Sequence, residues 1–571
     1  MFLPVFTRIH SKLFGSLAIL LLATSAWAGS KQEPKPADLT DEQKANLAMA
    51  DKIFYQEARL VEAMHKYTPM VETYIQNMKP DDELGAVPQS DAYFVGRLQL
   101  DQRGLANINY DNKKSGWLAT RILDRLTNFY RMDYLPLGFM QLVLLNNNFD
   151  KDHYNLVFER REFLGDVRTM VFNVQAKPHF KGPHFVGRIW VEDQDNHIVR
   201  LNGTYEPQNR GSFFFHFDSW RMNMQPGEWL PAYVYTEEAE TKYMMMRKLN
   251  MKGQTRLWGY DKKHSGRTDE LTDIQVDQND QIADKSDKDP NDFSPVQSQH
   301  QWEREAEDNV LDRMERAGVL APDGPVAKVL QTVVNNIEIT NKLNIEPEVR
   351  CRVLLTTPLE TFSVGHTIVI SRGLLDVLPD EASLAMVLSH ELAHIALGHR
   401  LNTRYSFADR TLFPDEQTFK KLSVDRDQHE EQEADTKAIA LLKNSPYADK
   451  LTSAALFLRA LQDRSAELQA LTTPHFGNRI AKKDELTRFE ALMQGAPELQ
   501  YKNIQQIAAL PLGSRIKLDP WDDHVEMKPM KPVPLYSARD KMPLEVTPFF
   551  LHLARFSATP EQSAEVAKKQ Q

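Results

Sequence analysis

Cysteine is almost absent from this chain. Cys351 is the only cysteine among 571 residues, so no intramolecular disulfide can form and a cysteine-ligated zinc site is ruled out. Cys351 lies within Val349–Thr356, whose sequence VRCRVLLT predicts a β-strand. We therefore expect Cys351 to be a packing residue and not a nucleophile.

Long hydrophobic runs are also lacking beyond residues 1–28, which predict a secretory signal peptide. Arg8 and Lys12 form a basic region, Leu13–Ala23 is apolar, and Ala26-Trp27-Ala28 matches an A-x-A cleavage site. The apolar run is about half as long as a membrane-spanning helix, which favours cleavage, with an uncleaved anchor as the alternative. No cysteine lies near the cut, so a lipoprotein anchor is excluded.

Positive charge is in short supply as well. The formal charge of −10 becomes −12 when Arg8 and Lys12, two positive charges, leave with the signal peptide. An acidic surface does not favour a nucleic-acid partner, and we expect none. We expect export without a transmembrane anchor after cleavage. The periplasm is favoured because an exported protein without disulfides suits that compartment, and secretion is the alternative.

The composition is that of a large globular protein. Hydrophobic residues make up 42% of the chain and charged residues 26%, and the length predicts two to four domains. Leu47–Met78 has helical periodicity, whereas the pattern from about Asp91 alternates as in strands. The segments that predict strands are Tyr93–Asn109, Asn155–Phe163, Val167–Ala176, Phe185–Asp193, His197–Tyr205, Ser212–Met222 and Tyr233–Glu238.

These strands follow one another with short turns, and one predicted helix, Leu118–Tyr130, interrupts them. This order predicts an antiparallel meander, as a curved sheet or a partial barrel. The pattern, including GRIWVEDQDNHIVRLNGTY, is similar to the curved sheets of periplasmic lipoprotein carriers. That resemblance implies lipid or lipoprotein binding, and an envelope protein partner is another use open to this domain. Its aromatic residues are more commonly core than a ligand groove.

An acidic segment separates the two halves of the sequence. Asp269–Asp292 contains eight aspartates, and their spacing does not match a calcium-binding EF-hand loop, so we interpret the segment as a solvated linker. The predicted organisation is a signal peptide (1–28), a helical lead-in (29–90), an antiparallel β-rich domain (91–265), an acidic linker (266–300), a catalytic domain (301–500) and a C-terminal extension (501–571). We expect the extension to pack on the catalytic domain.

The second half contains a metal-binding pattern inside an apolar helix. His390-Glu391-Leu392-Ala393-His394 is an H-E-x-x-H sequence, and histidines four apart lie on one face of a helix, so both imidazoles can reach one metal ion. Glu391 projects beside them, where it can take a proton from a metal-bound water. The alternatives are a solvated His/Glu cluster and a pair of satisfied core histidines. The surrounding apolar residues predict a core helix, capped by Asp380, where charged groups need partners.

A catalytic zinc site has three protein ligands and an open position for water. Glu431 is the best third donor, in a predicted helix over His429–Leu442. Asp435, four residues later on the same face, would orient a ligand imidazole. Taken alone, this run is more commonly an exposed acidic helix face, and Glu433 is a competing ligand. His399 has the wrong spacing to share the face of His394.

These motifs resemble those of the M48 zinc metallopeptidases. The resemblance covers roughly Val310–Leu492 and rests on SRGLLDVLPDEASLAMVLSHELAHIALGH and EEQEAD. It implies one Zn²⁺ per chain, held by His390, His394 and Glu431, with Glu391 as general base and Asp435 in support. Together with the predicted strands, it implies a multidomain α+β protein, in which the N-terminal antiparallel β-rich domain precedes a mainly α-helical zincin-like metallopeptidase domain with a small edge sheet.

The sequence departs from this family at two places. Members often have Asn-Ala-Phe on the strand that lines the substrate cleft, where this chain has Glu360-Thr361-Phe362. Members also often have a histidine where Thr473 stands. His475 or Arg479 could stabilise the oxyanion in its place.

The function that these motifs predict is an exported zinc endopeptidase. It would hydrolyse protein or peptide substrates in the cell envelope, with protein quality control as one role open to it. A peptide would lie antiparallel along Thr367–Ser371, taken as an edge strand. Two alternatives stay open: a periplasmic chaperone or binding protein whose metallopeptidase domain has little turnover, and a lipid or lipoprotein carrier that works through the β-rich domain.

Overall fold

The structure is a computed structural model. It describes residues 41–64, 66–81, 85–101, 104–109, 145, 148–181, 184–206, 215–243, 247–260, 295–399, 424–483, 485–498, 516–518, 525–527, 544, 546, 548 and 550–556. The predicted signal peptide, the helix predicted over Leu118–Tyr130 and most of the acidic linker lie outside these residues. Ala50–Gln571 forms one compact unit, and the features described below lie within it, apart from the start of the first helix at Asp41.

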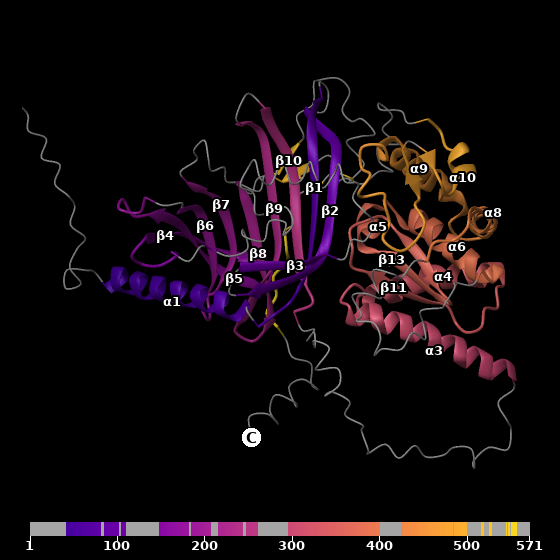
Figure 1. Cartoon of the computed structure of the whole chain (residues 1–571), viewed down its shortest axis with the longest axis horizontal. Coiled ribbons are helices and arrows are strands. Elements are labelled where there is room, and N and C mark those ends of the chain that lie inside the picture. The colour runs from indigo at the N-terminus through magenta and orange to yellow at the C-terminus, as the bar shows by residue number, and fades with distance from the viewer. Residues whose placement is uncertain are drawn as a thin grey trace, which may run out of the picture. The chain divides into compact units, whose positions relative to one another are not determined.

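The first half forms one antiparallel sheet of ten strands, in the order β3-β2-β1-β10-β9-β8-β7-β6-β5-β4 (Figure 1). The strands are β1 (Met70–Asp81), β2 (Gly85–Asp101), β3 (Gly104–Asn109), β4 (Tyr154–Leu164), β5 (Val167–Ala176), β6 (His184–Glu192), β7 (Ile198–Glu206), β8 (Phe217–Gln225), β9 (Glu228–Tyr243) and β10 (Arg247–Trp258). The predicted meander is confirmed, because β4 to β10 pair in chain order. The return of β10 to β1 places the earliest strand inside the sheet.

The predicted helix over Leu47–Met78 is wrong in its second half. Helix α1 spans Asp41–Met64, and β1 begins at Met70. Pro69 disfavours helical geometry in the residue before it. Strand β1 pairs with β2 and β10, which both come later in the chain. The spacing of apolar residues within β1 itself therefore does not reveal that it pairs with these strands. Glu57 of α1 forms a buried ion pair with Arg221 of β8 at 2.7 Å, which fixes the helix on the sheet.

The described residues from Val546 to Arg555 of the C-terminal extension contact this sheet, whereas the prediction placed the extension on the catalytic domain. The backbone N–H of Val546 donates to the side chain of Gln76 in β1 at 2.8 Å. The ring of Phe550 packs against Trp220 of β8, with 5.7 Å between centroids. Arg555 forms an ion pair with Glu192 of β6 at 2.9 Å. The segment therefore contacts the sheet at three separate strands.

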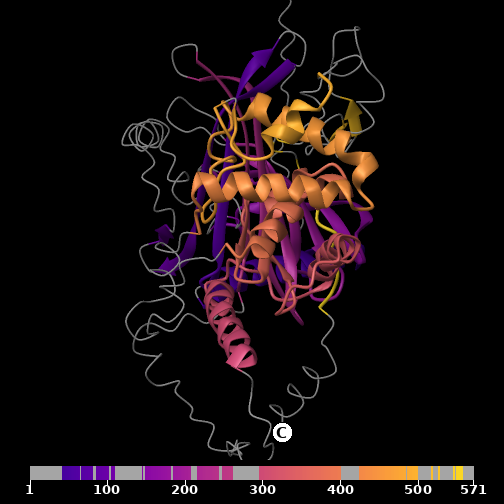
Figure 2. The ribbon, with the colours of Figure 1, turned by 90° about the vertical axis from the view of Figure 1, so that its right-hand side faces the viewer.

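The second half is mainly helical (Figure 2). Its helices α4, α8 and α9 pack against α6. The helices are α3 (Pro295–Arg316), α4 (Pro325–Asn341), α5 (Arg372–Val377), α6 (Glu381–Leu397), α8 (Gln428–Lys443), the short 3₁₀-helix η5 (Ala448–Lys450), α9 (Leu451–Arg464) and α10 (Glu490–Gln494). Two short hairpins pair β14 (Ala481–Lys482) with β15 (Glu485–Leu486), and β16 (Ile516–Leu518) with β17 (Val525–Met527). This arrangement matches the predicted multidomain α+β class, while the domain boundaries stay predictions.

A three-stranded sheet lies beside the helices, in the order β11-β13-β12. β11 (Arg350–Leu354) runs parallel to β13 (Thr367–Ser371), and β12 (Thr361–Val364) runs antiparallel to it. β13 is therefore the central strand, so its prediction as the edge strand for a peptide is wrong: its backbone groups already pair on both sides. The edge strand that follows Glu360 is β12.

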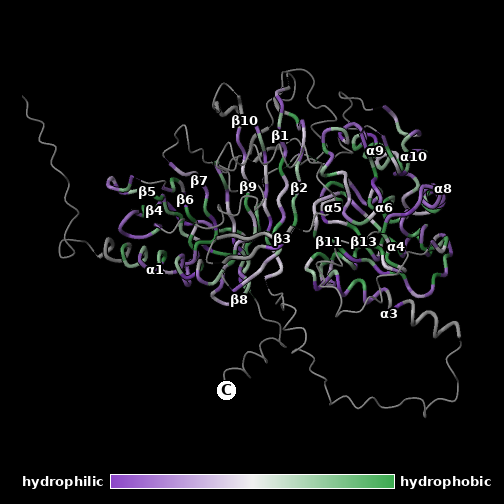
Figure 3. Tube along the Cα trace, viewed as in Figure 1, coloured by the Kyte–Doolittle hydropathy of each residue, from purple (hydrophilic) through white to green (hydrophobic). Residues whose placement is uncertain are grey.

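Helix α6 is the buried centre of the second half. Asp380 caps its start by accepting a hydrogen bond from the Ser383 N–H at 2.8 Å, as predicted. Gly398 ends it with a left-handed φ of 72°, a conformation that glycine adopts without strain. Twelve of its seventeen residues are buried, and its hydrophobic green trace contrasts with the purple of α8 (Figure 3). His390, Glu391 and His394 therefore lie on a helix that is buried over most of its length.

Candidate metal centre

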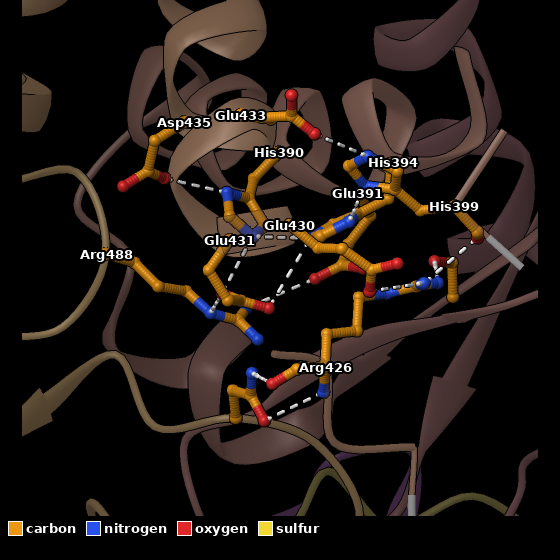
Figure 4. A network of polar contacts seen from close by, with 12 residues as sticks. His390, Glu391, His394, His399, Arg426, Glu430, Glu431, Glu433, Asp435 and Arg488 are labelled. Atoms are coloured by element: carbon orange, nitrogen blue, oxygen red, sulfur yellow. Dashed lines mark hydrogen bonds and ion pairs between the residues drawn. The ribbon is translucent and has the colours of Figure 1, made fainter. Parts of the chain in front are cut away.

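Two imidazoles from α6 face one another in the interior. His390 and His394 are one helical turn apart, are 0% and 1% exposed, and bring their Nε2 atoms within 3.0 Å (Figure 4). A separation of four residues on a helix produces this alignment. The predicted pair is thus present as two converging nitrogen donors.

Helix α8 supplies a carboxylate to the same point. Glu431 lies with Oε2 3.3 Å from His390 Nε2 and Oε1 3.5 Å from His394 Nε2. Ligand atoms of these three residues all lie within 4.8 Å of one another. Ala434 and Ala438 are fully buried on α8, and their small side chains let α8 pack closely against α6. The predicted three-residue cluster therefore exists in the structure.

A hydrogen bond with Asp435 determines which ring nitrogen of His390 faces the cluster. Asp435 Oδ1 lies 2.8 Å from His390 Nδ1, and the carboxylate can only accept, so Nδ1 carries the proton and Nε2 presents its lone pair. The other oxygen of Asp435 accepts from the backbone N–H of Phe489 at 2.6 Å. Asp435 thus has the orienting position that was predicted for it.

His394 is oriented through a contact that spacing arguments missed. Its Nδ1 lies 2.9 Å from Nδ1 of His399, and Nε2 of His399 lies 3.3 Å from Glu433. The consistent assignment has His394 donate to His399 and His399 donate to Glu433, which leaves Nε2 of His394 free to bind a metal. His399 and Glu433 therefore act on His394 through hydrogen bonds.

Arg488 completes the site and was not predicted. It is 3% exposed, its Nε lies 2.7 Å from Glu431 Oε2, and its Nη1 lies 3.2 Å from Glu391 Oε1. It reaches the site from the segment after the β14–β15 hairpin, which carries no metal-site spacing. A single arginine thus holds the proposed ligand carboxylate and the proposed base.

Neighbouring charges and burial set the ionisation of the groups in the cluster. Burial and Arg488 lower the pKa of His390, but the hydrogen bonds with Asp435 and Glu431 raise it by more. Burial lowers the pKa of His394, which keeps that imidazole neutral. Burial raises the pKa of Glu431, yet the charge of Arg488 and the neighbouring imidazoles of His390 and His394 bring it well below its usual range. The carboxylate is therefore ionised.

The donor set fits zinc. Two imidazole nitrogens and one carboxylate are ligands of a catalytic zinc site, with a fourth position for water. Both carboxylate oxygens of Glu431 are buried and make no hydrogen bond of good geometry within the described residues. A metal ion would satisfy these buried oxygens and both Nε2 lone pairs at once.

The two predicted oxyanion residues have other described contacts. The His475 backbone N–H donates to Glu360 at 2.9 Å, and its ring packs on Phe476. Arg479 is half-buried, which lowers its pKa, and its carbonyl accepts from Thr487. Thr473 donates its hydroxyl to the carbonyl of Gln469 at 2.6 Å. The oxyanion roles of His475 and Arg479 stay predictions.

Comparison with known proteins identifies the region that carries the cluster. Residues 359–471 match the model described as peptidase family M48. This part of the chain is an M48 peptidase domain. The match contains α6 with both histidines, and α8 with Glu431 and Asp435, so the predicted resemblance is confirmed. Arg488 lies beyond the matched residues.

The remaining comparisons concern the whole chain. No curated protein matches the sequence. The solved structures that are similar include a DUF1329 family protein from Desulfovibrio piger, which is 9% identical over 40% of this chain and 96% of that one, with a TM-score of 0.20. Among the described helices, none combines the length and the apolar character needed to cross a membrane.

We expect Asp435→Asn to weaken zinc binding by about 10 to 100-fold. The amide keeps the shape of the side chain, but it can turn an NH₂ toward the Nδ1–H of His390 and lose that hydrogen bond. Competition with a chromophoric chelator measures the affinity. Asp449→Asn, an acid-to-amide change in η5, is the matched control and should bind zinc as the wild type does. Unchanged affinity in Asp435→Asn would show that His390 needs no such support.

Proposed function

We propose that this protein is a zinc-dependent endopeptidase that hydrolyses peptide bonds of protein substrates in the cell envelope. The observation that carries the proposal is the convergence of His390, His394 and Glu431 on one point. Glu391 lies on α6 between the two histidines, and Arg488 contacts both Glu391 and Glu431. The M48 domain supports the metallopeptidase class. The metal ligands support zinc dependence, the edge strand β12 supports internal cleavage, and the predicted signal peptide supports envelope substrates.

The mechanism assigns one task to each residue. Zinc, when bound by His390, His394 and Glu431, supplies Lewis acidity to a water molecule and to the scissile carbonyl. Glu391 accepts a proton from the attacking water and delivers it to the leaving amine. Arg488 lies 3.2 Å from the carboxylate of Glu391, and this contact orients the base.

The substrate strand is β12. It is an edge of the three-stranded sheet and lies next to the site, because the carbonyl of Thr361 accepts from Nη1 of Arg488 at 3.5 Å. Ser363, on the same strand, accepts from Arg426 at 3.0 Å. An extended polypeptide that paired with β12 would bring a backbone carbonyl toward the zinc ligands without requiring a chain end. This geometry favours cleavage within a chain.

The location follows from the sequence. The predicted signal peptide, residues 1–28, and the single cysteine support export to the periplasm. A protease in that compartment meets unfolded envelope proteins, which supply the extended segments that an edge strand can bind. Protein quality control is therefore the role proposed for it.

Metal content and cleavage of an unstructured protein test this function together. The purified mature chain is expected to contain one zinc ion and to cut casein at internal positions. Dialysis against a chelator should remove both zinc and activity, and added zinc should restore them. Mass spectrometry of the products distinguishes internal cuts from trimming of the ends. A wild-type protein that binds no zinc and cuts nothing would overturn the proposal in favour of a binding protein.

A further inference from the structure

The large sheet contacts the peptidase domain through two acidic side chains on adjacent strands. Glu72 of β1 is 2% exposed. Its Oε1 accepts from the Thr357 backbone N–H at 2.6 Å and from the Tyr93 hydroxyl at 2.8 Å, and its Oε2 accepts from the Thr357 hydroxyl at 2.9 Å. Three neutral donors therefore bind this one carboxylate, and two of them belong to the peptidase domain.

Asp91 of β2 makes the second contact. Its two oxygens accept, one each, from the backbone N–H groups of Ala470 and Leu471, both at 2.8 Å. Tyr74 of β1 also donates to it at 3.1 Å. A carboxylate with one oxygen on each of two successive N–H groups fixes the position of that backbone closely.

The two segments held in this way also bond to each other. We call them the site loops: Thr356–Glu360, which leads into β12, and Ala470–Phe476. The Leu359 N–H donates to the Leu471 carbonyl at 2.8 Å. Glu360 in turn accepts from the N–H groups of His475 and Phe476, both at 2.9 Å. The site loops are thus one hydrogen-bonded unit.

Close packing leaves the first site loop little room to move. Gly373 of α5 approaches the Thr357 carbonyl so closely that a Cβ on it would lie 1.8 Å from that oxygen. Its N–H donates to the Thr356 carbonyl at 3.1 Å. The loop is therefore held between α5 on one side and Glu72 on the other.

The site loops continue directly into the catalytic geometry. Thr361, the residue after Glu360, accepts from Arg488, and Arg488 binds Glu391 and Glu431. The path from Asp91 to the proposed base therefore runs through hydrogen bonds and three consecutive backbone positions. Close-packed protein interiors transmit small displacements. An error of about 1 Å in the placement of a substrate can lower the rate about 100-fold.

The cost of these acids supports a role beyond stability. The donors described for Glu72 and Asp91 are neutral groups, and desolvation raises the pKa of Asp91 to about 6 in spite of its backbone hydrogen bonds. A pair of apolar residues would join the two surfaces without burying a carboxylate. Apolar contacts, however, would not fix the direction of the backbone N–H groups.

We propose that Glu72 and Asp91 are positioning residues of the peptidase site, through which the ten-stranded sheet sets the place of β12 beside Arg488 and Glu391. The proposal rests on the proposed function, because it assigns the sheet a part in substrate placement. The ten-stranded sheet then helps to hold the peptidase site in its geometry, in addition to any ligand that the sheet itself binds.

Glu72→Gln and Asp91→Asn test the proposal, with Asp218→Asn as the matched control. Asp218 is a buried carboxylate of the same sheet, paired with Arg200 at 2.8 Å. In Asp91→Asn, one carbonyl oxygen and one NH₂ must face two N–H groups, so one hydrogen bond is lost. Each variant is compared with the full-length wild type in zinc content, in amide hydrogen exchange of Thr361–Val364, and in kcat/KM for an internally quenched peptide.

Both test variants are expected to keep one zinc per chain, to exchange the amides of β12 at least about tenfold faster, and to lose about 10 to 100-fold in kcat/KM. The control should unfold at a lower temperature and match the wild type in zinc content, in amide exchange of β12 and in kcat/KM. Exchange and kcat/KM equal to those of the control would overturn the proposal. Exchange needs no turnover, so an inactive wild type would reject the proposed function while the β12 result still decided this inference.

Discussion

Glu391→Gln is expected to abolish most peptide hydrolysis and to leave zinc in place. The amide cannot accept the proton of the attacking water, and loss of a general base lowers the rate by about 10² to 10⁴-fold. Glutamine has nearly the shape of glutamate, and Arg488 retains its contact with Glu431 at 2.7 Å. The ligands His390, His394 and Glu431 are unchanged, so one zinc ion per chain should remain.

The measurement is the initial rate on an internally quenched peptide, together with metal analysis of the same sample. Glu381→Gln is the control: it makes the same chemical change in the first turn of α6, where Glu381 accepts from Tyr447 at 2.8 Å, and it should keep wild-type activity. If Glu391→Gln hydrolysed the peptide normally, another residue would be the base. If it lost zinc as well as activity, Glu391 would have a structural role.

The site was predictable where its geometry is local. His390, Glu391 and His394 are fixed relative to one another by one helical turn, so five letters of sequence and an apolar context place them. The cap at Asp380 is local in the same way. Glu431 and Asp435 needed one further step, because helical spacing set their shared face but not the helix they meet. The need of a catalytic zinc site for a third donor supplied that step and the family resemblance agreed with it, and the structure brings the two helices together.

The missed residues depend on how distant segments meet. Arg488 reaches the site after a hairpin of two short strands, and nothing in its neighbourhood of sequence encodes a metal site. His399 was set aside because five residues is the wrong spacing for a second ligand on one face. The spacing argument leaves out a supporting role: the helix ends at Leu397, and the left-handed turn at Gly398 brings His399 back to Nδ1 of His394.

The sheets show the same division. Alternation located the strands from β4 to β9 within a few residues, because each side-chain pattern is a property of one segment. The order of strands is a property of the whole chain, which is why β1 was taken as part of a helix and β13 as an edge. In the three-stranded sheet, β12 comes before β13 in sequence yet lies outside it. Sequence separation alone does not give that order.

Glu431→Ala is expected to remove zinc under conditions in which the wild type keeps it. Two imidazoles then remain as ligands, and Arg488 loses the carboxylate that offset its charge at this point. A cation would then have to bind beside a buried guanidinium. The affinity for zinc should therefore fall further than it does on loss of an orienting residue, which costs about 10 to 100-fold. Metal analysis after dialysis and chelator competition measure the change.

Glu433→Ala is the comparison that makes this result decisive. Glu433 is exposed, competed with Glu431 as the third ligand in the sequence, and contacts His399 and His429 rather than the converging Nε2 atoms. Its loss should therefore weaken zinc binding by no more than loss of an orienting residue does. If Glu433→Ala lost zinc and Glu431→Ala retained it, the third ligand would be Glu433. In that event α8 would have to turn its other face toward α6 when the metal binds, and the close packing of Ala434 and Ala438 argues against such a rotation.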